Sequence, residues 1–325
     1  MKFSKPRRLR PPRFRADWFL DWGDMSVSPS PFYSEYHGHR IAHLEGVLAH
    51  ACPPEKRRIF LAGDSSLDNK YWLLSDELHP AANGMERYLS PPRSVADVAH
   101  HLNAQCASRQ LPYFALNCAV EESALCERRG GALLAQDRFL ASRVQAGDVV
   151  VVSCGGNDVV LKPSLSLILN LATVLVCASQ AAVEAGTAAG MGHFINLFKT
   201  QYEDYIRRLC GGRGGITVIA CMVYYPQEAL PGVSSWADFS LGLLGYNRRP
   251  ETLQRLMQAV FRQAVSRITV EGCRVIPLAL YDVLDSRSPT DYTERVEPSG
   301  SGGAKMARAF LEALGNERSS PPEGL

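Results

Sequence analysis

The residues Gly63, Asp64 and Ser65 are the part of this 325-residue sequence where chemistry is easiest to place. They follow the apolar run 59–62, which predicts a strand, and precede the segment 67–78, which has the composition of a helix. A serine in such a turn has its backbone N–H at a helix N-terminus, where unpaired N–H groups and the helix dipole stabilise negative charge. Ser65 is therefore a candidate nucleophile. The alternative is that Asp64 and Ser65 only cap the helix.

A second turn of this kind follows the segment 148–153, which reads Asp-Val-Val-Val-Val-Ser. Such a continuous apolar run is typical of a strand that is buried on both faces. The next residues are Cys154 and the sequence Gly-Gly-Asn-Asp at 155–158. A second polar turn is thus predicted at the carboxyl end of a second strand.

Together, and in this order, the two turns resemble those of the SGNH hydrolases, also called the GDSL esterase/lipase family. In that family Gly-Asp-Ser supplies the nucleophile, and a Gly-x-Asn-Asp block supplies an asparagine whose side chain completes the oxyanion hole. The resemblance covers about residues 58–314 and implies that Ser65 is the nucleophile and Asn157 an oxyanion donor. The supporting positions of the two motifs are held by Asp64, Gly156 and Asp158.

A third motif of the family is altered here. Family members usually carry Asn-x-Gly-x-x-Gly after the second strand, and the last glycine gives a backbone N–H to the oxyanion hole. Counted from Asn117, Ala119 and Glu122 stand at the two glycine positions. The N–H of Glu122 is still expected to join the N–H of Ser65 and the Asn157 side chain. A carboxylate at this position, however, would oppose the developing negative charge.

The largest departure from the family precedes the last predicted helix, where family members carry Asp-x-x-His. This sequence has Glu294 and Glu297 at those positions, followed by the family's Pro-Ser-x-x-Gly, and its last histidine is His193. In the family the histidine takes the serine proton and the aspartate orients it. Glu297 is therefore expected to act as the base, provided that burial or Glu294 raises its pKa from the ordinary value of about 4.3.

Two alternatives to a glutamate base stay open. A distant histidine could swing toward Ser65, or the chain could keep the fold and have lost the chemistry. The histidines concerned are His79, His100, His101 and His193. We expect a serine ester hydrolase without a cofactor, acting on a small-molecule, lipid or glycan ester. The competing functions are a catalytically inactive binding module of the same fold and an acyltransferase acting on a glycan or lipid.

The composition is that of a globular protein with a core, because 46% of the residues are hydrophobic and 21% are charged. A net charge of +2 gives no reason to expect a nucleic-acid partner. The nine cysteines are scattered without a Cys-x-x-Cys pair, so the sequence predicts neither a zinc site nor a disulfide framework, and it favours a reducing, cytoplasmic location. His39 and His43 have metal-ligand spacing, but no Asp or Cys motif accompanies them, so no metal is expected.

The N-terminal residues 1–15 are basic and contain prolines. No apolar segment follows them, which argues against a secretory signal. The remaining interpretations are a solvated basic arm and a mitochondrial targeting segment.

Five apolar runs predict a mostly parallel sheet, and the segments between them predict helices on both faces, which makes a three-layer α/β/α sandwich. Strands are expected at 59–62, 111–117, 148–153, 216–220 and 273–278. Helices are expected at 36–51, 67–78, 95–106, 165–183, 193–210, 252–270 and 304–314. The domain should cover 32–314, with a basic and aromatic arm at 1–31 and a disordered tail at 315–325.

Two segments allow more than one interpretation. The uncharged segment 163–183 is long enough to span a bilayer, but the strands on both sides of it should share one sheet, so we expect a buried helix. The segment 222–250 is rich in Tyr, Trp, Pro and Gly and follows a strand's carboxyl end, where α/β sheets bind ligands. It is interpreted either as a loop or lid that shapes the substrate site or as a packed surface loop.

Overall fold

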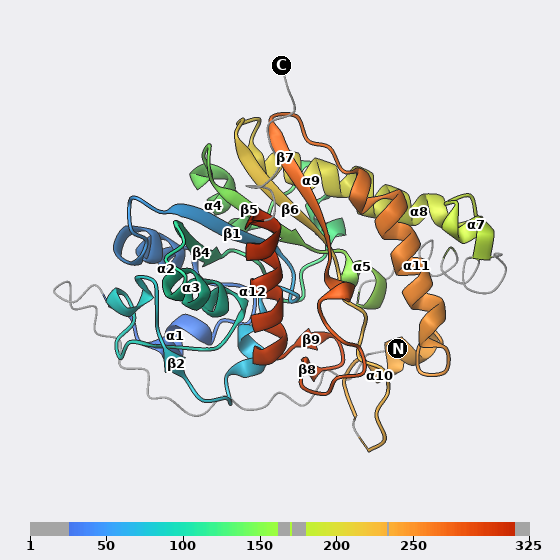
Figure 1. Ribbon diagram of the computed structural model, residues 1–325, viewed down its shortest axis with the longest axis horizontal. Helices are drawn as coiled ribbons and strands as arrows, with labels where there is room; N and C mark the ends of the chain where they lie inside the picture. The colour runs from blue at the N-terminus through green and yellow to red at the C-terminus, as the bar shows by residue number, and fades with distance from the viewer. Residues whose placement is uncertain (1–25, 162–169, 171–179, 233, 316–325) are drawn as a thin grey trace.

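The computed structural model describes residues 26–161, 170, 180–232 and 234–315, and its centre is a five-stranded sheet (Figure 1). The strand order is β4-β1-β5-β6-β7, and all neighbouring strands run parallel. The strands are β1 (Arg57–Gly63), β4 (Tyr113–Asn117), β5 (Val149–Ser153), β6 (Ile216–Met222) and β7 (Cys273–Ala279). The predicted sheet is thereby confirmed.

Helices cover both faces of this sheet. Side chains alternate between the two faces, and because those on each face are apolar, each face packs against helices. In β1, Ile59 and Leu61 pack in one apolar cluster with α3 (Val98–Ser108) and α12 (Gly300–Gly315). Phe60 and Ala62 pack in a second cluster with α4 (Ala135–Arg143), α9 (Tyr202–Cys210) and α11 (Pro250–Gln263). The three-layer α/β/α sandwich is therefore confirmed.

Short elements connect and flank these layers. The helical ones are α1 (Pro29–Tyr33), α2 (Ile41–Gly46), η1 (Val47–Ala51), η2 (Asn69–Leu73), η3 (Met85–Arg87), η4 (Leu125–Gly131), α5 (Gly156–Val160), α7 (Gln180–Glu184), α8 (Met191–Ile195), η6 (Asn196–Gln201), α10 (Asp238–Leu243), η7 (Val265–Arg267) and η8 (Leu280–Asp282). Two small hairpins add β2 (His79–Pro80) with β3 (Arg93–Ser94), and β8 (Tyr292–Glu294) with β9 (Glu297–Pro298).

The helix predicted at 67–78 is wrong, because only the 3₁₀ turn η2 forms there. The polar side chains at its start are used in tertiary contacts. Asn69 donates from Nδ2 to the Pro298 carbonyl at 3.0 Å and accepts from the Val98 N–H at 3.2 Å. These contacts fold the chain inward and prevent a regular helix.

Other predicted helices differ mainly at their ends. The segment 36–51 forms α2 and the π-helical η1, and 252–270 ends its α-helix at Gln263. The last helix begins at Gly300 rather than 304, because the Ser299 hydroxyl accepts the Gly302 N–H at 3.0 Å. Its end, Gly315, belongs to α12 and not to the predicted tail.

Some predictions fall outside the described residues. These are most of the helix at 165–183, nearly all of the arm at 1–31, and the tail beyond Gly315. No helix within the described ranges is long and apolar enough to cross a membrane.

Candidate active site

The turn after β1 presents Ser65 in a fixed conformation. Gly63 has a φ of 131°, and a Cβ there would lie 1.7 Å from the Ser153 carbonyl oxygen, so only glycine fits. The Asp64 carboxylate accepts hydrogen bonds from the Ser66 N–H at 3.1 Å and the Ser66 hydroxyl at 2.7 Å. Burial raises the pKa of Asp64 to about 6. Asp64 thus braces the turn and leaves the Ser65 hydroxyl to other partners.

The partner of Ser65 is Glu297, which comes from β9 near the other end of the chain. The Ser65 Oγ donates to Glu297 Oε1 at 3.4 Å, and the two residues are 6% and 2% exposed. This distance is long for an O–H···O bond, but catalytic pairs often tighten only when substrate binds. The contact between Asn69 and the Pro298 carbonyl holds β9 beside the Ser65 turn. The structure therefore brings together the two residues that the sequence suggested as nucleophile and base.

The surroundings of Glu297 make it a stronger base than an ordinary glutamate. Burial raises its pKa well above the usual range, and the bond from Ser65 only partly opposes this rise. The negative charges of Asp64, Glu294 and Asp68 raise the pKa further. Its second oxygen, Oε2, has no hydrogen-bond partner among the described residues. Such a carboxyl can exchange a proton much nearer to neutral pH.

Glu294 lies beside Glu297 across the small hairpin of β8 and β9, whose register pairs the two residues. Its Oε2 is buried and has no hydrogen-bond partner in the described part of the chain. No hydrogen bond joins the two carboxyls there either. Glu294 therefore acts on Glu297 through its charge and does not hold it as an orienting aspartate would hold a histidine.

Asn157 follows β5 at the start of α5, next to the Ser65 turn. Its Nδ2 donates to the Ser123 carbonyl at 3.0 Å, and both Asn157 and Gly156 line the same pocket as Ser65. A side-chain amide has two hydrogens, so one remains for a ligand oxygen. Asp158 has a different role, because its carboxylate caps the start of η4 by accepting two backbone N–H groups.

Glu122 adopts a φ of 58°, the left-handed region that favours glycine. This conformation matches the glycine position that the family resemblance implied. The carboxylate accepts a hydrogen bond from the Tyr36 hydroxyl at 3.0 Å, and the residue is exposed. Glu122 does not line the pocket around Ser65. The predicted role of its N–H in the oxyanion hole stays a prediction.

The neighbouring residue, Glu121, is an acid that the sequence reasoning missed. It is 2% exposed, and its Oε2 has no hydrogen-bond partner among the residues described. Burial raises its pKa well above the usual range, and the charges of Glu297 and Asp68 raise it further. Its N–H donates to Asp68, which also forms a buried ion pair with Lys70 at 2.6 Å. The only sequence signal was the pair of adjacent acids, of which one turns inward.

An apolar pocket opens beside Ser65, Asn157 and Glu297. Its apolar walls come from α5, α8, η6, the end of β6, the segment 223–244, α11 and the β8–β9 turn. The apolar lining residues are Val159, Phe194, Phe198, Met222, Val223, Tyr224, Pro226, Trp236, Leu241, Leu244, Leu253, Leu256, Met257, Val260 and Val296. Seven of them lie in 222–250, so that segment forms part of the pocket wall, and its predicted role in shaping a substrate site stays a prediction.

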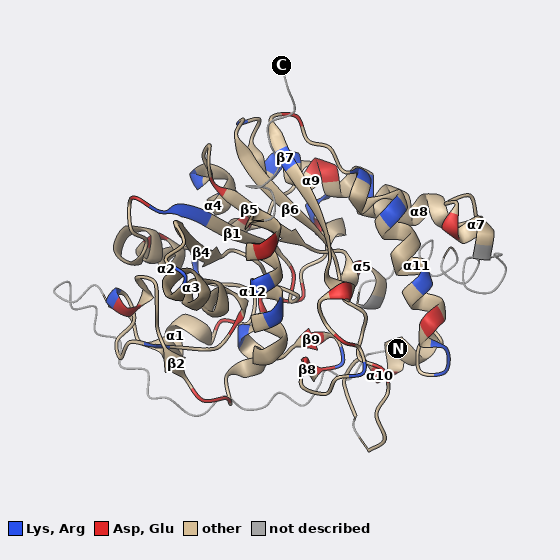
Figure 2. Ribbon diagram, in the orientation of Figure 1, with Lys and Arg blue, Asp and Glu red and all other residues tan. Residues whose placement is uncertain are grey.

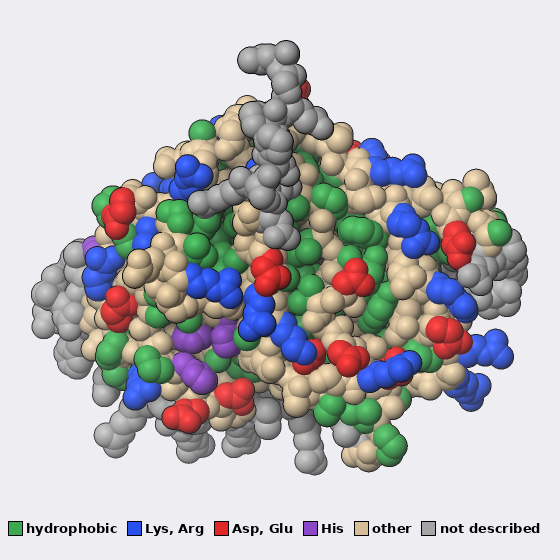
Figure 3. Space-filling model, viewed as in Figure 1, with side chains coloured by type: hydrophobic (Ala, Val, Ile, Leu, Met, Phe, Trp, Pro, Cys, Tyr) green, Lys and Arg blue, Asp and Glu red, His purple; other side chains and the backbone are tan. Residues whose placement is uncertain are grey.

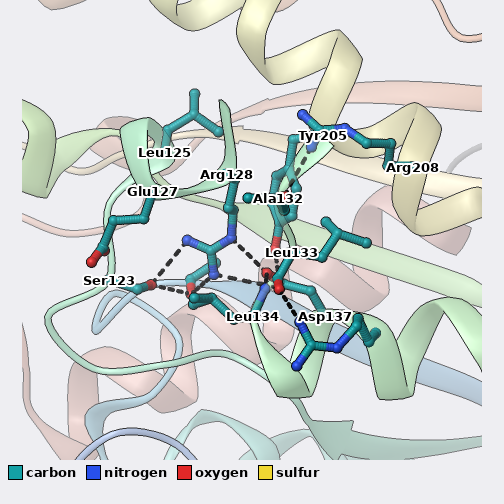
Figure 4. A network of polar contacts seen from close by, with 12 residues as sticks. Ser123, Leu125, Glu127, Arg128, Ala132, Leu133, Leu134, Asp137, Tyr205 and Arg208 are labelled. Atoms are coloured by element: carbon teal, nitrogen blue, oxygen red, sulfur yellow. Dashed lines mark hydrogen bonds and ion pairs between the residues drawn. The ribbon is translucent and has the colours of Figure 1, made fainter. Parts of the chain in front are cut away.

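A second group of buried polar contacts is centred on Arg128 and Asp137 (Figure 4). Arg128 pairs with Asp137 at 2.8 Å and donates to the Gly63 carbonyl at 3.2 Å and to the Ser123 hydroxyl at 3.1 Å. Tyr205 donates its hydroxyl to Asp137 at 2.6 Å. Arg128 therefore fixes both the end of β1 and the loop that holds Asn157.

Histidines do not complete this site. None of them lines the pocket around Ser65 in the described part of the chain. His79, His100 and His101 form a separate group of rings, and His193 lies on α8. The ring of His39 is buried and bonded to the Phe32 carbonyl, and no group of three or more potential ligands that could hold a metal occurs among the described residues.

Comparison with solved structures gives distant matches over most of the chain. They include an extracellular lipase from Streptomyces rimosus (13% identity, TM-score 0.40) and a carbohydrate acetylesterase from Sinorhizobium meliloti (15%, 0.40). A third is a protein described as a candidate SGNH hydrolase from Slackia heliotrinireducens (12%, 0.42). Each match covers 80% of this chain and 99% of the other.

No protein-family model matches the sequence, and no curated protein is significantly similar to it. The site described above therefore rests on the geometry of this chain.

Proposed function

We propose that the protein is a serine ester hydrolase in which Ser65 attacks the ester and Glu297 is the base. The observation that carries the proposal is the contact between the Ser65 Oγ and the buried Glu297 carboxyl, inside a pocket that Asn157 also lines. A carboxyl whose pKa is raised by burial can do the work that a histidine does in an ordinary triad.

The reaction follows from these positions. Glu297 takes the hydroxyl proton while the Ser65 Oγ forms a bond to the ester carbonyl carbon. The carbonyl oxygen becomes negative and accepts hydrogen bonds from the N–H groups of Ser65 and Glu122 and from the Asn157 amide. The C–O bond to the alcohol then breaks, and Glu297 returns the proton to the leaving oxygen. Water, deprotonated by Glu297, releases the acid from Ser65 by the same steps.

The pocket indicates which ester fits. Its walls beyond the polar end carry Phe198, Leu256 and Met257 among other apolar side chains. Burying an acyl chain there is favourable by about 0.8 kcal/mol per CH₂ group. We therefore propose an ester with an apolar acyl chain as the substrate.

The described cysteines are free thiols, which supports the predicted reducing compartment.

The test is labelling of the purified chain with a fluorophosphonate, followed by peptide mapping, together with hydrolysis of p-nitrophenyl esters. We expect label on Ser65 and loss of both label and hydrolysis in Ser65→Ala. Ser108→Ala, which removes an exposed hydroxyl at the end of α3, should behave as the unchanged protein.

Other outcomes separate the competing functions. A folded chain that takes no label on Ser65 between pH 5 and 10, yet binds a fatty acid in the pocket, would make it an inactive binding module. Faster acyl transfer to an added alcohol than to water would make it a transferase. Full activity in Ser65→Ala would remove the assignment altogether.

A further inference from the structure

The helix α10 carries two strongly exposed apolar side chains. Phe239 is 63% exposed and Leu243 is 74% exposed. They are four residues apart, so they lie on the same side of the helix. Among the described residues, the only other exposed large hydrophobic side chain is that of Leu74, which is less exposed, at 39%. Figure 3 shows hydrophobic side chains at the surface in the region where Figure 1 places α10.

The same helix forms part of the wall of the Ser65 pocket. Leu241 is fully buried and lines the pocket, and Leu244, just after the helix, lines it as well. One short element thus has apolar residues on its inner side, toward the pocket, and on its outer side, toward solvent. An apolar molecule on the outer surface would be next to the pocket that we assign to the acyl chain.

The position of α10 is fixed by the segment that carries Glu297. Arg295, between the two hairpin strands, pairs with Asp238 at 2.9 Å and donates to the Asn247 Oδ1 at 2.7 Å. Both partners flank the exposed side chains in sequence. The exposed face is therefore held in place rather than left as a loose loop.

Positive charge adjoins this face. Arg248 and Arg249 lie in the short connection between α10 and α11 and are exposed, and Arg255 is exposed on α11. Figure 2 shows basic residues at the start of α11, beside α10. Glu251 is the acid among them. Exposed apolar side chains flanked by arginines are the combination that binds anionic membrane surfaces.

We propose that Phe239 and Leu243 insert into an anionic lipid surface, with Arg248 and Arg249 contacting the headgroups, so that a lipid ester passes directly into the pocket. This inference rests on the proposed function, and it names a membrane lipid ester as the substrate class. A lipid surface is favoured over a protein partner because the exposed apolar side chains adjoin both the exposed arginines and an apolar pocket that Leu241 and Leu244 line.

The experiment uses the full chain with Ser65→Ala, so that lipid is not consumed, and measures co-sedimentation with vesicles. Vesicles of phosphatidylcholine with phosphatidylserine should bind it, and phosphatidylcholine alone should bind less. Adding Phe239→Ser and Leu243→Ser should weaken binding at least about tenfold, because two apolar side chains no longer enter the lipid. The matched control, Leu74→Ser, should change binding less than about twofold.

Charge is tested separately. Arg248→Gln with Arg249→Gln should weaken binding to the anionic vesicles about tenfold and have little effect with phosphatidylcholine alone. Arg57→Gln with Arg109→Gln removes two exposed arginines elsewhere and should change neither. Binding that persists in the Phe239→Ser, Leu243→Ser chain, or no binding to any vesicle, would overturn the proposal.

Hydrolysis of soluble p-nitrophenyl butyrate, with Ser65 intact, separates this proposal from the proposed function. The Phe239→Ser, Leu243→Ser chain should keep that activity and lose activity on vesicle lipid. A chain that binds vesicles but hydrolyses no ester would refute the hydrolase and leave the docking surface standing. A dimer that these two substitutions dissociate would assign the face to a second copy of the chain instead.

Discussion

Two buried charged clusters meet at the Ser65 turn, and they differ in how completely their atoms are paired. In the Arg128 cluster, one positive and one negative side chain face each other, and Tyr205 adds a hydrogen bond to Asp137. In the second cluster, two buried acids, Glu121 and Glu297, lie close enough that the charge of Glu297 raises the pKa of Glu121. Each of these acids has an oxygen without a hydrogen-bond partner among the described residues.

This difference in pairing indicates different roles for the two clusters. A buried charge whose partners are all present rigidifies the structure around it. A buried acid that lacks partners costs stability when it ionises, and natural proteins keep such groups mainly where their proton affinity is used. We infer that the Arg128 cluster holds the Ser65 turn and that the glutamate cluster moves the proton.

The largest predicted effect comes from removing the base. Glu297→Gln keeps the size of the side chain but cannot accept the Ser65 proton, so kcat/KM for a p-nitrophenyl ester should fall by about 10³–10⁴-fold. Glu294→Gln is the matched control on the same hairpin. It should cost less than about tenfold, because Glu294 acts only through its charge. Equal losses in the two variants would remove the distinction between them.

The next effect is on stability and tests the paired cluster. Arg128→Met leaves the Asp137 carboxylate buried without its partner, which should lower the free energy of unfolding by about 3–5 kcal/mol. Arg138→Met removes an exposed arginine from the same helix as Asp137 and should cost less than about 1 kcal/mol. Urea denaturation measures both. If Arg128→Met unfolded at the same urea concentration as the unchanged chain, the supporting role would be wrong.

The sheet and the Gly63 turn were easier to predict than the buried Arg128 cluster that holds them. The sheet was predictable because strands buried on both faces must be apolar, as in β5, and this leaves a continuous pattern in the sequence. The turn at Gly63 was predictable because only glycine fits against Ser153. Nothing in the local sequence distinguishes Arg128 from its neighbour Arg129, because arginines in a polar segment normally lie in solvent.

The second cluster was predictable only in part. Glu297 followed from the register of its motif, since Pro298 and Ser299 fix its place before the last helix. The helix predicted at 67–78 was wrong because Asn69 and Lys70 are buried in tertiary contacts that local composition does not reveal. Glu121 was missed because the left-handed conformation of Glu122 decides which of the two acids points inward.

A smaller effect should follow from Glu294, and it appears in the pH dependence. Glu294→Gln removes a negative charge that raises the pKa of Glu297, so the pKa of Glu297 should fall and the acid limb of the rate profile should move about one pH unit lower. The other acids that raise the pKa of Glu297, Asp64 and Asp68, stay in place. Glu122→Gln is the matched control and should leave the profile unchanged, since its side chain is exposed.

The buried acid Glu121 should make stability depend on pH. The pKa of Glu121 is raised on folding above its usual 4.5, so its contribution to stability is fully present below pH 4.5 and is lost as the pH rises through the folded value. Glu121→Gln should therefore raise the Tm at pH 8 relative to the unchanged chain, and raise it less at pH 5. A Tm that fell equally at both pH values would show that Glu121 is a structural group.

The smallest effect is expected at Glu122, which lies in the sequence between Glu121 of one cluster and Ser123, which contacts Arg128 of the other. Glu122→Gly removes a side chain from a φ of 58°, so relief of strain should contribute about 1 kcal/mol of stability, partly offset by the lost bond from Tyr36. Its backbone N–H remains, so ester hydrolysis should change less than about threefold. Glu122→Ala is the control, since it removes the carboxylate but keeps the strained backbone. A large gain in activity for both variants would mean that the carboxylate opposes the oxyanion after all. A gain in stability for glycine alone, with activity unchanged in both variants, would show instead that the cost of Glu122 lies in its backbone conformation and not in its charge.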